Sequence, residues 1–390
     1  MSTEQIATEP NVTEPNATEP LAIEIAGLEK RYGNALVLNQ LSLRVLKGEL
    51  LVILGESGSG KSTLLKLIAG IEKPQGGCVR ISGIDQDRRL PHKRDVAMVF
   101  QKGNGYEHLS VRQNLDLASK NSSTPDQVTR WVDCLKIKET LHQKLIQLSG
   151  GQLQRVAIAR AMLSGKSIVL MDEPLAHLNQ SLREEIRELI SMVHKESKRT
   201  LVYVTHDSDD SFYLANRIAV LASGQIQQVG DPRAVYLTPN SKEAAQLLGQ
   251  PTIDILTLPR VWFEPNQESI SSTLECGVRS NDWQINRIET SETVKTAAHP
   301  RGLSMTAKGL VARGSIVTCR WMGSRWLLEI QCPERIRITC QTGGSDHERE
   351  LLTAWEWSRN DAILDSCGYL EASIPRSCIQ TFNLGHTRQE

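Results

Sequence analysis

The sequence has no hydrophobic run that approaches the roughly 18 apolar residues needed to cross a bilayer. Its N-terminus also lacks the basic region followed by an apolar stretch that marks a secretory signal. The 45 basic and 45 acidic side chains give a formal net charge of 0, so bulk charge gives no reason to expect a nucleic-acid partner. A membrane-spanning or secreted chain is therefore not predicted.

Metal-ligand spacing is missing among the cysteines. The 8 cysteines form no C-x-x-C pair, which argues against a zinc site. Free thiols in a reducing compartment are the expectation. These cysteines are Cys78, Cys134, Cys276, Cys319, Cys332, Cys340, Cys367 and Cys378.

The first 20 residues carry a repeat with a period of five residues, Thr8-Glu9-Pro10, Thr13-Glu14-Pro15 and Thr18-Glu19-Pro20. An acidic segment that is punctuated by proline and nearly free of large apolar residues cannot bury enough surface to fold. Residues 1–20 are therefore predicted to be a disordered tail, and the sequence leaves its role open. The 390 residues, 39% of them hydrophobic, suffice for two or three domains.

A glycine-rich segment follows the apolar run Leu50–Leu54, which is short and typical of a buried strand. Apolar residues then recur at helical spacing over residues 64–69. Glycines on a strand-to-helix turn let backbone amides converge on an anion, and the helix dipole adds to the attraction. This context predicts a phosphate-binding loop in which Lys61 reaches the terminal phosphates and the Ser62 hydroxyl binds magnesium. The loop comprises Gly55, Glu56, Ser57, Gly58, Ser59, Gly60, Lys61, Ser62 and Thr63.

Two carboxylates follow a second apolar run, over residues 168–171. We expect Asp172 to hold a metal ion and Glu173 to polarise an attacking water. A further run, over residues 200–205, ends at His206, which can donate a hydrogen bond to a γ-phosphate. Such residues also fit a solvated loop, but their order downstream of the phosphate loop favours the functional interpretation.

The pentapeptide L-S-G-G-Q at residues 148–152 precedes a strong helical pattern. Polar, glycine-rich backbone at a helix N-terminus is a second candidate anion site, with a capping turn as the alternative. Between residues 102 and about 150 the pattern is helical and more polar, which predicts a small helical insertion. Strands alternate with helices across residues 50–230 and call for a largely parallel sheet with helices on both faces.

Together these motifs stand in the order seen in ABC transporter ATPases, which residues 21–245 closely resemble. The L-S-G-G-Q pentapeptide separates that family from other phosphate-loop proteins. Residues 94–101 and 225–232 look most like importer ATPases of the maltose type. The resemblance implies an α/β P-loop NTPase core, ATP and Mg²⁺ as ligands, and ATP hydrolysis.

The resemblance also assigns roles to single residues. Tyr32 is similar to the adenine-stacking aromatic and Gln101 to the glutamine that senses magnesium and the catalytic water, while Glu173 resembles the general base and His206 the switch histidine. The γ-phosphate of a nucleotide held by another subunit would be contacted by Ser149, Gly150, Gly151 and Gln152. One phosphate loop and one signature per chain then predict a dimer, of two copies or with a paralogous ATPase subunit. Its expected partners are transmembrane permease subunits and, through them, a solute-binding protein.

Two segments depart from the family pattern. Residues 102–108 contain two glycines where the maltose type usually has bulky residues, which puts the identity of the membrane partner in doubt. The usual P-L-S-x-L-D after the general base is P-L-A-H-L-N here, with Ala176 and Asn179 in place of serine and aspartate. Slower or less cooperative hydrolysis is the expectation.

Residues 246–390 hold six of the 7 tryptophans and several short alternating runs, typical of an all-β region. Importer ATPases of this type often carry an OB-like (TOBE) β-barrel here, which supports dimerisation or binds regulators. Residues 277–283 resemble a diverged form of its G-I-R-P-E-H motif. Interleaved Trp and Arg also fit nucleic-acid binding, but no basic cluster accompanies them and core packing is expected.

The predicted function is that of the ATP-hydrolysing subunit of an importer, peripheral on the cytoplasmic face of the membrane, with a sugar or polyol as the first expected solute. Iron, polyamine or sulfate stay open, because other subunits select the solute. A soluble ABC protein of translation or DNA repair is the rival, although such proteins usually carry tandem ATPase units or a coiled-coil insertion. A scaffold that binds ATP without turnover is opposed by Glu173 and His206.

Overall fold

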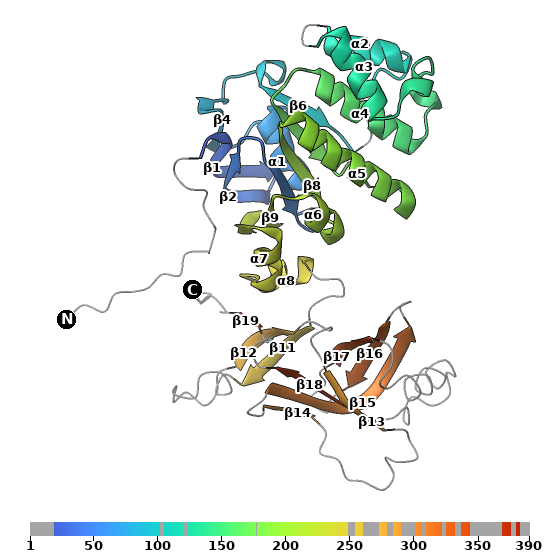
Figure 1. Ribbon diagram of the computed structural model, residues 1–390. Helices are drawn as coiled ribbons and strands as arrows, with labels where there is room; N and C mark the ends of the chain where they lie inside the picture. Colours follow the sequence, from blue (N-terminus) through green and yellow to red (C-terminus); the bar gives the residue numbers. More distant parts are fainter. Residues whose placement is uncertain are drawn as a thin grey trace, which may run out of the picture. The chain divides into compact units, whose positions relative to one another are not determined.

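The computed structural model describes residues 19–101, 105–120, 123–176 and 178–248, followed by the backbone of the strands between Asp254 and Phe382. The chain forms two compact units, Met1–Asn240 and Ser241–Glu390 (Figure 1). Residues 1–18, which hold most of the acidic repeat, lie outside the described residues, as do Gly103 and His177. Cys78 and Cys134, the cysteines whose side chains are described, are free thiols, as expected.

The first unit is built around a six-stranded sheet with the order β10-β9-β3-β8-β7-β6. Neighbouring strands from β9 to β6 run parallel, and only β10 is antiparallel to its neighbour. The largely parallel sheet predicted from the sequence is therefore confirmed. Its strands are β3 (Leu50–Leu54), β6 (Val96–Val99), β7 (Ile168–Asp172), β8 (Thr200–Thr205), β9 (Arg217–Ala222) and β10 (Gln225–Gly230).

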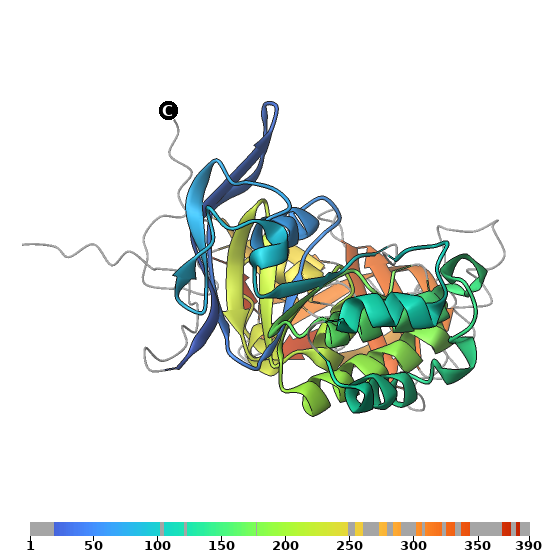
Figure 2. The ribbon, with the colours of Figure 1, turned by 90° about the horizontal axis from the view of Figure 1, so that it is seen from above.

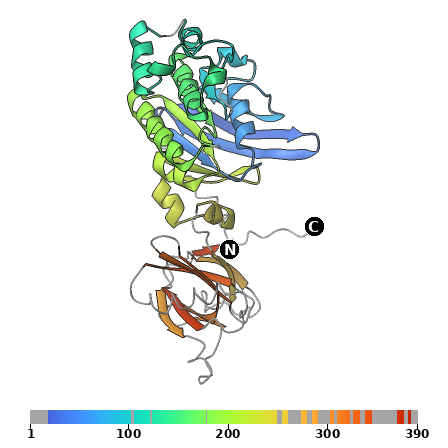
Figure 3. The same ribbon diagram turned by 90° about the vertical axis from the view of Figure 1, so that its right-hand side faces the viewer.

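A second, antiparallel sheet with the order β2-β1-β4-β5 belongs to the same unit. The sequence does not predict this separate sheet, because alternation within a strand does not reveal its partner. The long β1–β2 hairpin extends away from the helices (Figure 3). The strands are β1 (Leu21–Tyr32), β2 (Ala35–Leu46), β4 (Gly76–Ile81) and β5 (Ile84–Asp85).

Both faces of the central sheet are buried, which explains why its strands are apolar without alternation. Leu50 and Val52 of β3 belong to one core, with α4 (Gly150–Leu163) and α5 (Gln180–Ser197). Leu51 and Ile53 belong to the other core, with α1 (Lys61–Ala69) and the antiparallel sheet. The prediction of helices on both faces is therefore incomplete, because a sheet shares the second face with α1.

The helical insertion consists of α2 (Val111–Ser119), α3 (Pro125–Cys134) and two short 3₁₀ turns, Lys138–Thr140 and Leu145–Gln147. The helices α2 and α3 pack on α4, on the side away from the β1–β2 hairpin (Figure 2). Capping boxes start both helices, from Ser110 and from Thr124. The remaining elements up to Leu247 are the 3₁₀ turn Pro91–Lys93, α6 (Ser208–Leu214), α7 (Pro232–Leu237) and α8 (Lys242–Leu247).

Beyond α8, the elements with a described backbone are strands, and their pairs are antiparallel. They form the sheets β11-β12-β19 and β13-β18-β15-β16-β17, with β14 beside β15. The OB-like assignment of this region stays a prediction. The strands are β11 (Asp254–Pro259), β12 (Thr273–Val278), β13 (Gln284–Glu289), β14 (Gly302–Met305), β15 (Gly309–Trp321), β16 (Arg325–Gln331), β17 (Arg337–Gly343), β18 (Tyr369–Pro375) and β19 (Gln380–Phe382).

In the part of the chain that the structure describes, no helix has the length and apolar character that crossing a bilayer requires.

Candidate functional site

The phosphate loop joins β3 to α1 at the carboxyl end of the central strands. Gly60 caps α1 with φ +104° and offers no side chain to the first amides of the helix. Gly55 is fixed by close packing, because a Cβ there would lie 2.4 Å from the Leu221 carbonyl oxygen. The amides at the start of α1 are thus available to an anion, as the sequence predicted.

One polar atom inside the loop lacks a protein partner. The Ser59 hydroxyl oxygen is buried, and no hydrogen-bond partner for it occurs among the described residues. Buried hydroxyls are almost always paired. An orphaned hydroxyl inside a cradle of free amides therefore fits a ligand rich in acceptor oxygens, such as a polyphosphate.

Lys61 is 4% exposed, and its ammonium donates to the carbonyl oxygens of Gly55 (2.9 Å) and Glu56 (2.8 Å). Its Nζ also lies 3.4 Å from Oε1 of Glu173. Burial lowers the pKa of Lys61, and the Glu173 carboxylate opposes that shift. A buried cation held mainly by carbonyl oxygens can exchange those partners for phosphate oxygens.

Ser62 and Asp172 meet although they are far apart in the sequence. The Ser62 hydroxyl donates to Oδ1 of Asp172 at 2.7 Å. Burial raises the pKa of the Asp172 carboxyl, while the hydrogen bond from Ser62 lowers it. A hydroxyl and a carboxylate are oxygen ligands of the kind Mg²⁺ prefers, and Mg²⁺ completes its shell with waters and phosphate oxygens.

The described residues contain no cluster of three or more His, Cys, Asp or Glu that could hold a metal ion by themselves. Gln101, the third candidate ligand, is exposed just beyond β6, the strand next to β7. Residues 102–104, which follow it, lie outside the described residues.

Glu173 and His206 follow the neighbouring strands β7 and β8. Nδ1 of His206 lies 3.3 Å from Oε2 of Glu173, and the Glu173 amide donates to the Val204 carbonyl. Glu173 has φ +41°, an uncommon conformation for a residue with a side chain. Such strain persists only where the surroundings enforce it, and it clusters at functional sites.

Tyr32 lies at the end of β1, and its residue surface is 46% exposed. Its hydroxyl donates a hydrogen bond to Glu72. Burial and Glu72 raise the pKa of this hydroxyl, and the Thr63 side chain opposes that shift. The Lys30 ammonium lies 5.1 Å from the ring centroid. The fold therefore brings this aromatic ring to the edge of the phosphate loop, where a base can stack on it.

The signature turn is arranged differently. Ser149 caps α4: its hydroxyl accepts from the Gln152 amide at 3.3 Å, and the Gln152 side chain accepts from the Ser149 amide at 3.0 Å. Ser149 and Gly150 are exposed. In the described residues, no hydrogen bond or ion pair joins this turn to residues 55–63. The capping turn, which the sequence offered as the alternative to an anion site, is therefore present. It does not cover Ser149 and Gly150, which stay exposed.

Sequence reasoning missed a set of ion pairs that ties α5 to the turn after His206. Arg183 pairs with Asp207, which caps α6. Arg187 pairs with Asp210 at 2.6 Å, and Asp210 also accepts from the Tyr203 hydroxyl at 3.1 Å. These pairs do leave a signal in the sequence. Arg183 and Arg187 are four residues apart on α5, and Asp207 and Asp210 are three residues apart at the start of α6.

Comparison with known proteins agrees with this geometry. Residues 38–176 match the family described as ABC transporter. The spermidine/putrescine import ATP-binding protein PotA of Legionella pneumophila is 42% identical over 235 residues, which cover 59% of this chain and 65% of that protein. The sn-glycerol-3-phosphate import ATP-binding protein UgpC 1 of Rhizobium etli is 41% identical over 240 residues, or 60% of this chain and 69% of that protein.

A solved structure described as cbiO1 from Clostridium perfringens, part of the ABC transporter complex cbiONQ, is also similar. It superposes with a TM-score of 0.51 at 27% identity, over 56% of this chain and 91% of that one. The fold thus defines a P-loop NTPase core of the ATP-binding-cassette type. This chain belongs to the ABC transporter family. It spans 65% of the length of the PotA relative.

Proposed function

We propose that this chain hydrolyses ATP as the motor subunit of an importer and that two phosphate loops and two signature turns combine in a dimer. The observation that carries the proposal is the separation of the two half-sites. Ser62 and Lys61 of the phosphate loop contact Asp172 and Glu173, and His206 contacts Glu173. Among the described residues, no hydrogen bond or ion pair joins the Ser149 turn to this loop, and Ser149 and Gly150 are exposed. Each nucleotide would then be completed by the Ser149–Gln152 turn of a second subunit.

Within one half-site, Lys61 and the loop amides would bind the β- and γ-phosphates, and Tyr32 would stack on the base. Ser62, Asp172 and Gln101 would hold Mg²⁺, which would neutralise charge on the phosphates. Glu173 would take a proton from the attacking water as its oxygen bonds to the γ-phosphorus and the bond to ADP breaks. His206 would orient the γ-phosphate and hold Glu173 in place.

ATP binding would join the two subunits, and loss of the γ-phosphate would release them. We propose that this movement acts on separate permease subunits and that the chain is peripheral on the cytoplasmic face of the membrane. A sugar or polyol is the first proposed solute. The relatives named above import a polyamine and a glycerol phosphate, and a xylose/arabinose import ATP-binding protein, XacJ of Haloferax volcanii, is 38% identical over 60% of this chain.

Complementation between two inactive variants tests the composite site. Lys61→Ala removes the phosphate-binding cation, and Ser149→Arg blocks the signature turn. Each variant alone should lose hydrolysis. In a mixed dimer, one site keeps the Lys61 of one subunit and the Ser149 of the other, so an equal mixture should recover about a quarter of the parent rate if subunits exchange at random.

The thermal unfolding of each variant, compared with the parent, verifies that it is folded. If the mixture stays inactive while both variants are folded and dimeric, the composite site is wrong. If Ser149→Arg alone hydrolyses ATP at the parent rate, the dimer is not required for catalysis.

A further inference from the structure

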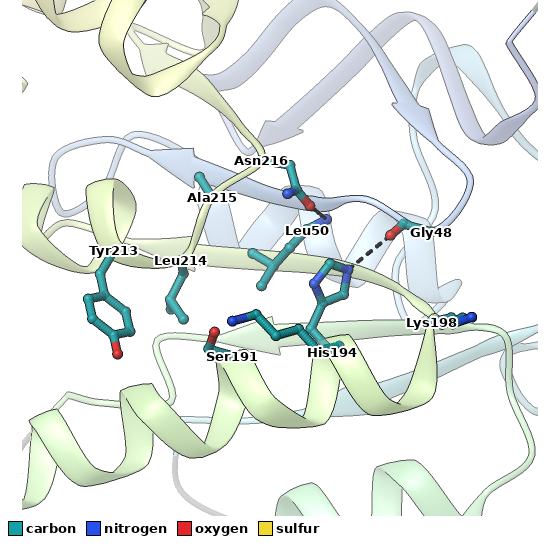
Figure 4. Close-up of a pocket in the computed structure, with 10 residues that line it drawn as sticks. Gly48, Leu50, Ser191, His194, Lys198, Tyr213, Leu214, Ala215 and Asn216 are labelled. Carbon is teal, nitrogen blue, oxygen red and sulfur yellow. Dashed lines mark hydrogen bonds between the residues drawn. The ribbon is translucent and has the colours of Figure 1, made fainter.

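A cavity of about 580 Å³ lies at the opposite end of the central sheet from the phosphate loop. Its walls are the turn before β3, the C-terminal half of α5 and the segment after α6 (Figure 4). No residue of the nucleotide site lines it. The cavity is therefore distinct from the proposed nucleotide site.

The charge of the lining has one sign. Lys195, Lys198 and His194 line the cavity, and no carboxylate does. Nε2 of His194 lies 2.9 Å from the Gly48 carbonyl oxygen and donates to it, because a carbonyl only accepts. The other ring nitrogen of His194 faces the interior of the cavity (Figure 4).

Neutral hydrogen-bond donors add to this positive lining. Oδ1 of Asn216 accepts from the Leu50 amide at 2.8 Å, which leaves the Asn216 NH₂ group as a donor. The Ser191 hydroxyl also lines the cavity. A lining that includes two lysines and neutral donors suits carboxylates.

The N-terminal segment leaves the fold beside this cavity. The Pro20 carbonyl accepts from the Lys47 amide at 2.9 Å, and the next residue, Gly48, lines the cavity. Gly48 also lies against Lys198, since a Cβ on Gly48 would be 3.6 Å from the Lys198 carbonyl oxygen. Whatever precedes Pro20 is thus tethered at the rim of a positively charged cavity.

The tethered segment carries the complementary charge. Residues 1–18 contain Glu4, Glu9 and Glu14, and the chain has no Lys or Arg before Lys30. An extended chain advances about 3.3–3.6 Å per residue, so Glu14 can reach roughly 20 Å back from Pro20. A short tether also gives the glutamates a high effective concentration at the cavity.

We propose that the acidic Thr-Glu-Pro repeat of this chain docks in this cavity, with Glu9 and Glu14 against Lys195 and Lys198. This gives a role to a sequence motif that the nucleotide site does not use. The lysines also complement the dipole of α5, which is a contribution to folding stability. In the proposal, the same two lysines also hold the repeat in the cavity, which is separate from their contribution to folding stability.

Zero-length carbodiimide crosslinking of the full chain, read by mass spectrometry, measures docking directly. Glu9 and Glu14 should couple to Lys195 and Lys198 within one chain. Raising the salt to about 1 M shortens the Debye length to about 3 Å, and the yield should fall at least about fivefold. The Lys30–Glu72 pair, 3.1 Å apart and with side chains only 11% and 21% exposed, is an internal standard that should change little.

Two controls separate docking from proximity. Lys47 lies at the tether, so a freely moving repeat would couple to it at least as often as to Lys195 or Lys198. The second control uses fluorescence anisotropy of a dye on the chain's N-terminus. It should drop in the double variant Lys195→Gln/Lys198→Gln and stay at the parent value in Lys138→Gln, which removes an exposed lysine elsewhere.

Equal coupling to Lys47, Lys138 and the cavity lysines would overturn the proposal, and so would equal anisotropy in the parent and the double variant. Crosslinks that join two chains would also overturn it, in favour of docking onto a second copy. ATP hydrolysis of the double variant should match the parent. The test therefore stands apart from the proposed catalytic mechanism.

Discussion

The phosphate loop and the signature turn both place glycines and a serine at the start of a helix, but their surroundings differ. The phosphate loop is walled by the ends of β7 and β8, and Lys61 is almost fully buried among its partners. The signature turn is exposed, and its hydrogen bonds close on its own helix. The proposed half-site at the phosphate loop is thus shaped within the chain, whereas the signature turn would present a preformed surface to a second subunit. The difference teaches that similar local sequence can make a cradle or a contact face, depending on what packs around it.

The largest expected effect lies on the phosphate-loop side. Glu173→Gln should reduce the rate of ATP hydrolysis by about 10²–10⁴-fold, because the amide cannot accept the proton of the attacking water. Nucleotide binding should persist, since the loop amides and Lys61 are unchanged. Phosphate release and nucleotide affinity are the measurements, with the exposed Glu139→Gln as a matched control. A variant that keeps half the parent rate would remove Glu173 from the chemistry.

Gly60 of the phosphate loop and Gly150 of the signature turn should respond in opposite ways to alanine. Gly60→Ala places a Cβ 2.7 Å from Leu38 Cδ2 in a backbone with φ +104°, so we expect a loss of about 1–3 kcal/mol in unfolding free energy and weaker ATP binding. Gly150 has an ordinary φ, and its nearest neighbour would be Leu178 Cδ2 at 3.7 Å. Gly150→Ala should therefore keep or raise stability, by up to about 1 kcal/mol.

Denaturant unfolding and nucleotide titration of both variants test this contrast. Hydrolysis by Gly150→Ala should still fall, since a methyl group would stand on the proposed contact face. Equal destabilisation of the two variants would mean that the signature turn is as tightly enclosed as the phosphate loop.

The buried carboxylate of the phosphate-loop half-site predicts a pH effect of moderate size. Because burial raises the pKa of Asp172, the folded state retains a proton that the unfolded state releases near pH 4. The stability that this proton contributes is thus full at lower pH and is lost as pH rises through the folded pKa. Each tenfold difference in proton affinity between the folded and unfolded states corresponds to about 1.4 kcal/mol. Asparagine does not ionise, so Asp172→Asn should not lose this stability. The unfolding free energy of the variant minus that of the parent should therefore increase as pH rises from about 4 through the folded pKa of Asp172.

Added Mg²⁺ and ATP should stabilise the parent more than Asp172→Asn, because the variant lacks the anionic ligand. Thermal unfolding with and without Mg²⁺ and ATP provides the comparison. A variant that gains as much as the parent would show that Asp172 is not a metal ligand.

The smallest expected effect comes from Asn179, the position proposed to couple the two half-sites. The Asn179 side chain caps α5 by accepting from the Leu182 amide at 3.0 Å, and aspartate caps helices about equally well. Asn179→Asp should therefore leave stability within a few tenths of a kcal/mol and make hydrolysis faster or more cooperative. Asn179→Ser, which keeps a cap without a charge, is the matched control. Unchanged rate and Hill coefficient in Asn179→Asp would end the idea that this position couples the sites.

The sequence predicted the central strands and the phosphate loop closely, because their signals are local. Leu50–Leu54 and Ile168–Asp172 are apolar runs of strand length, and Lys61 follows the glycines that turn the chain. The separate antiparallel sheet was not predictable, since its paired strands β1 and β4 are separated in the sequence by β2, β3, the phosphate loop and α1. The pairs Arg183–Asp207 and Arg187–Asp210 also went unseen, as charge patterns on two helices do not say which helices meet.

The sequence by itself determined the local elements of the proposed nucleotide site: a phosphate loop, two carboxylates, a histidine and a signature turn. Each is readable because a few neighbouring residues fix its local geometry. Only the tertiary structure decided which of them meet. It brought Ser62 to Asp172 and Glu173 to Lys61 and His206, left the Ser149 turn facing outward, and set the exit of the acidic repeat beside a basic cavity. The physical reason is that strand order and helix packing, which align distant segments, depend on burial over the whole core and not on any one stretch of sequence.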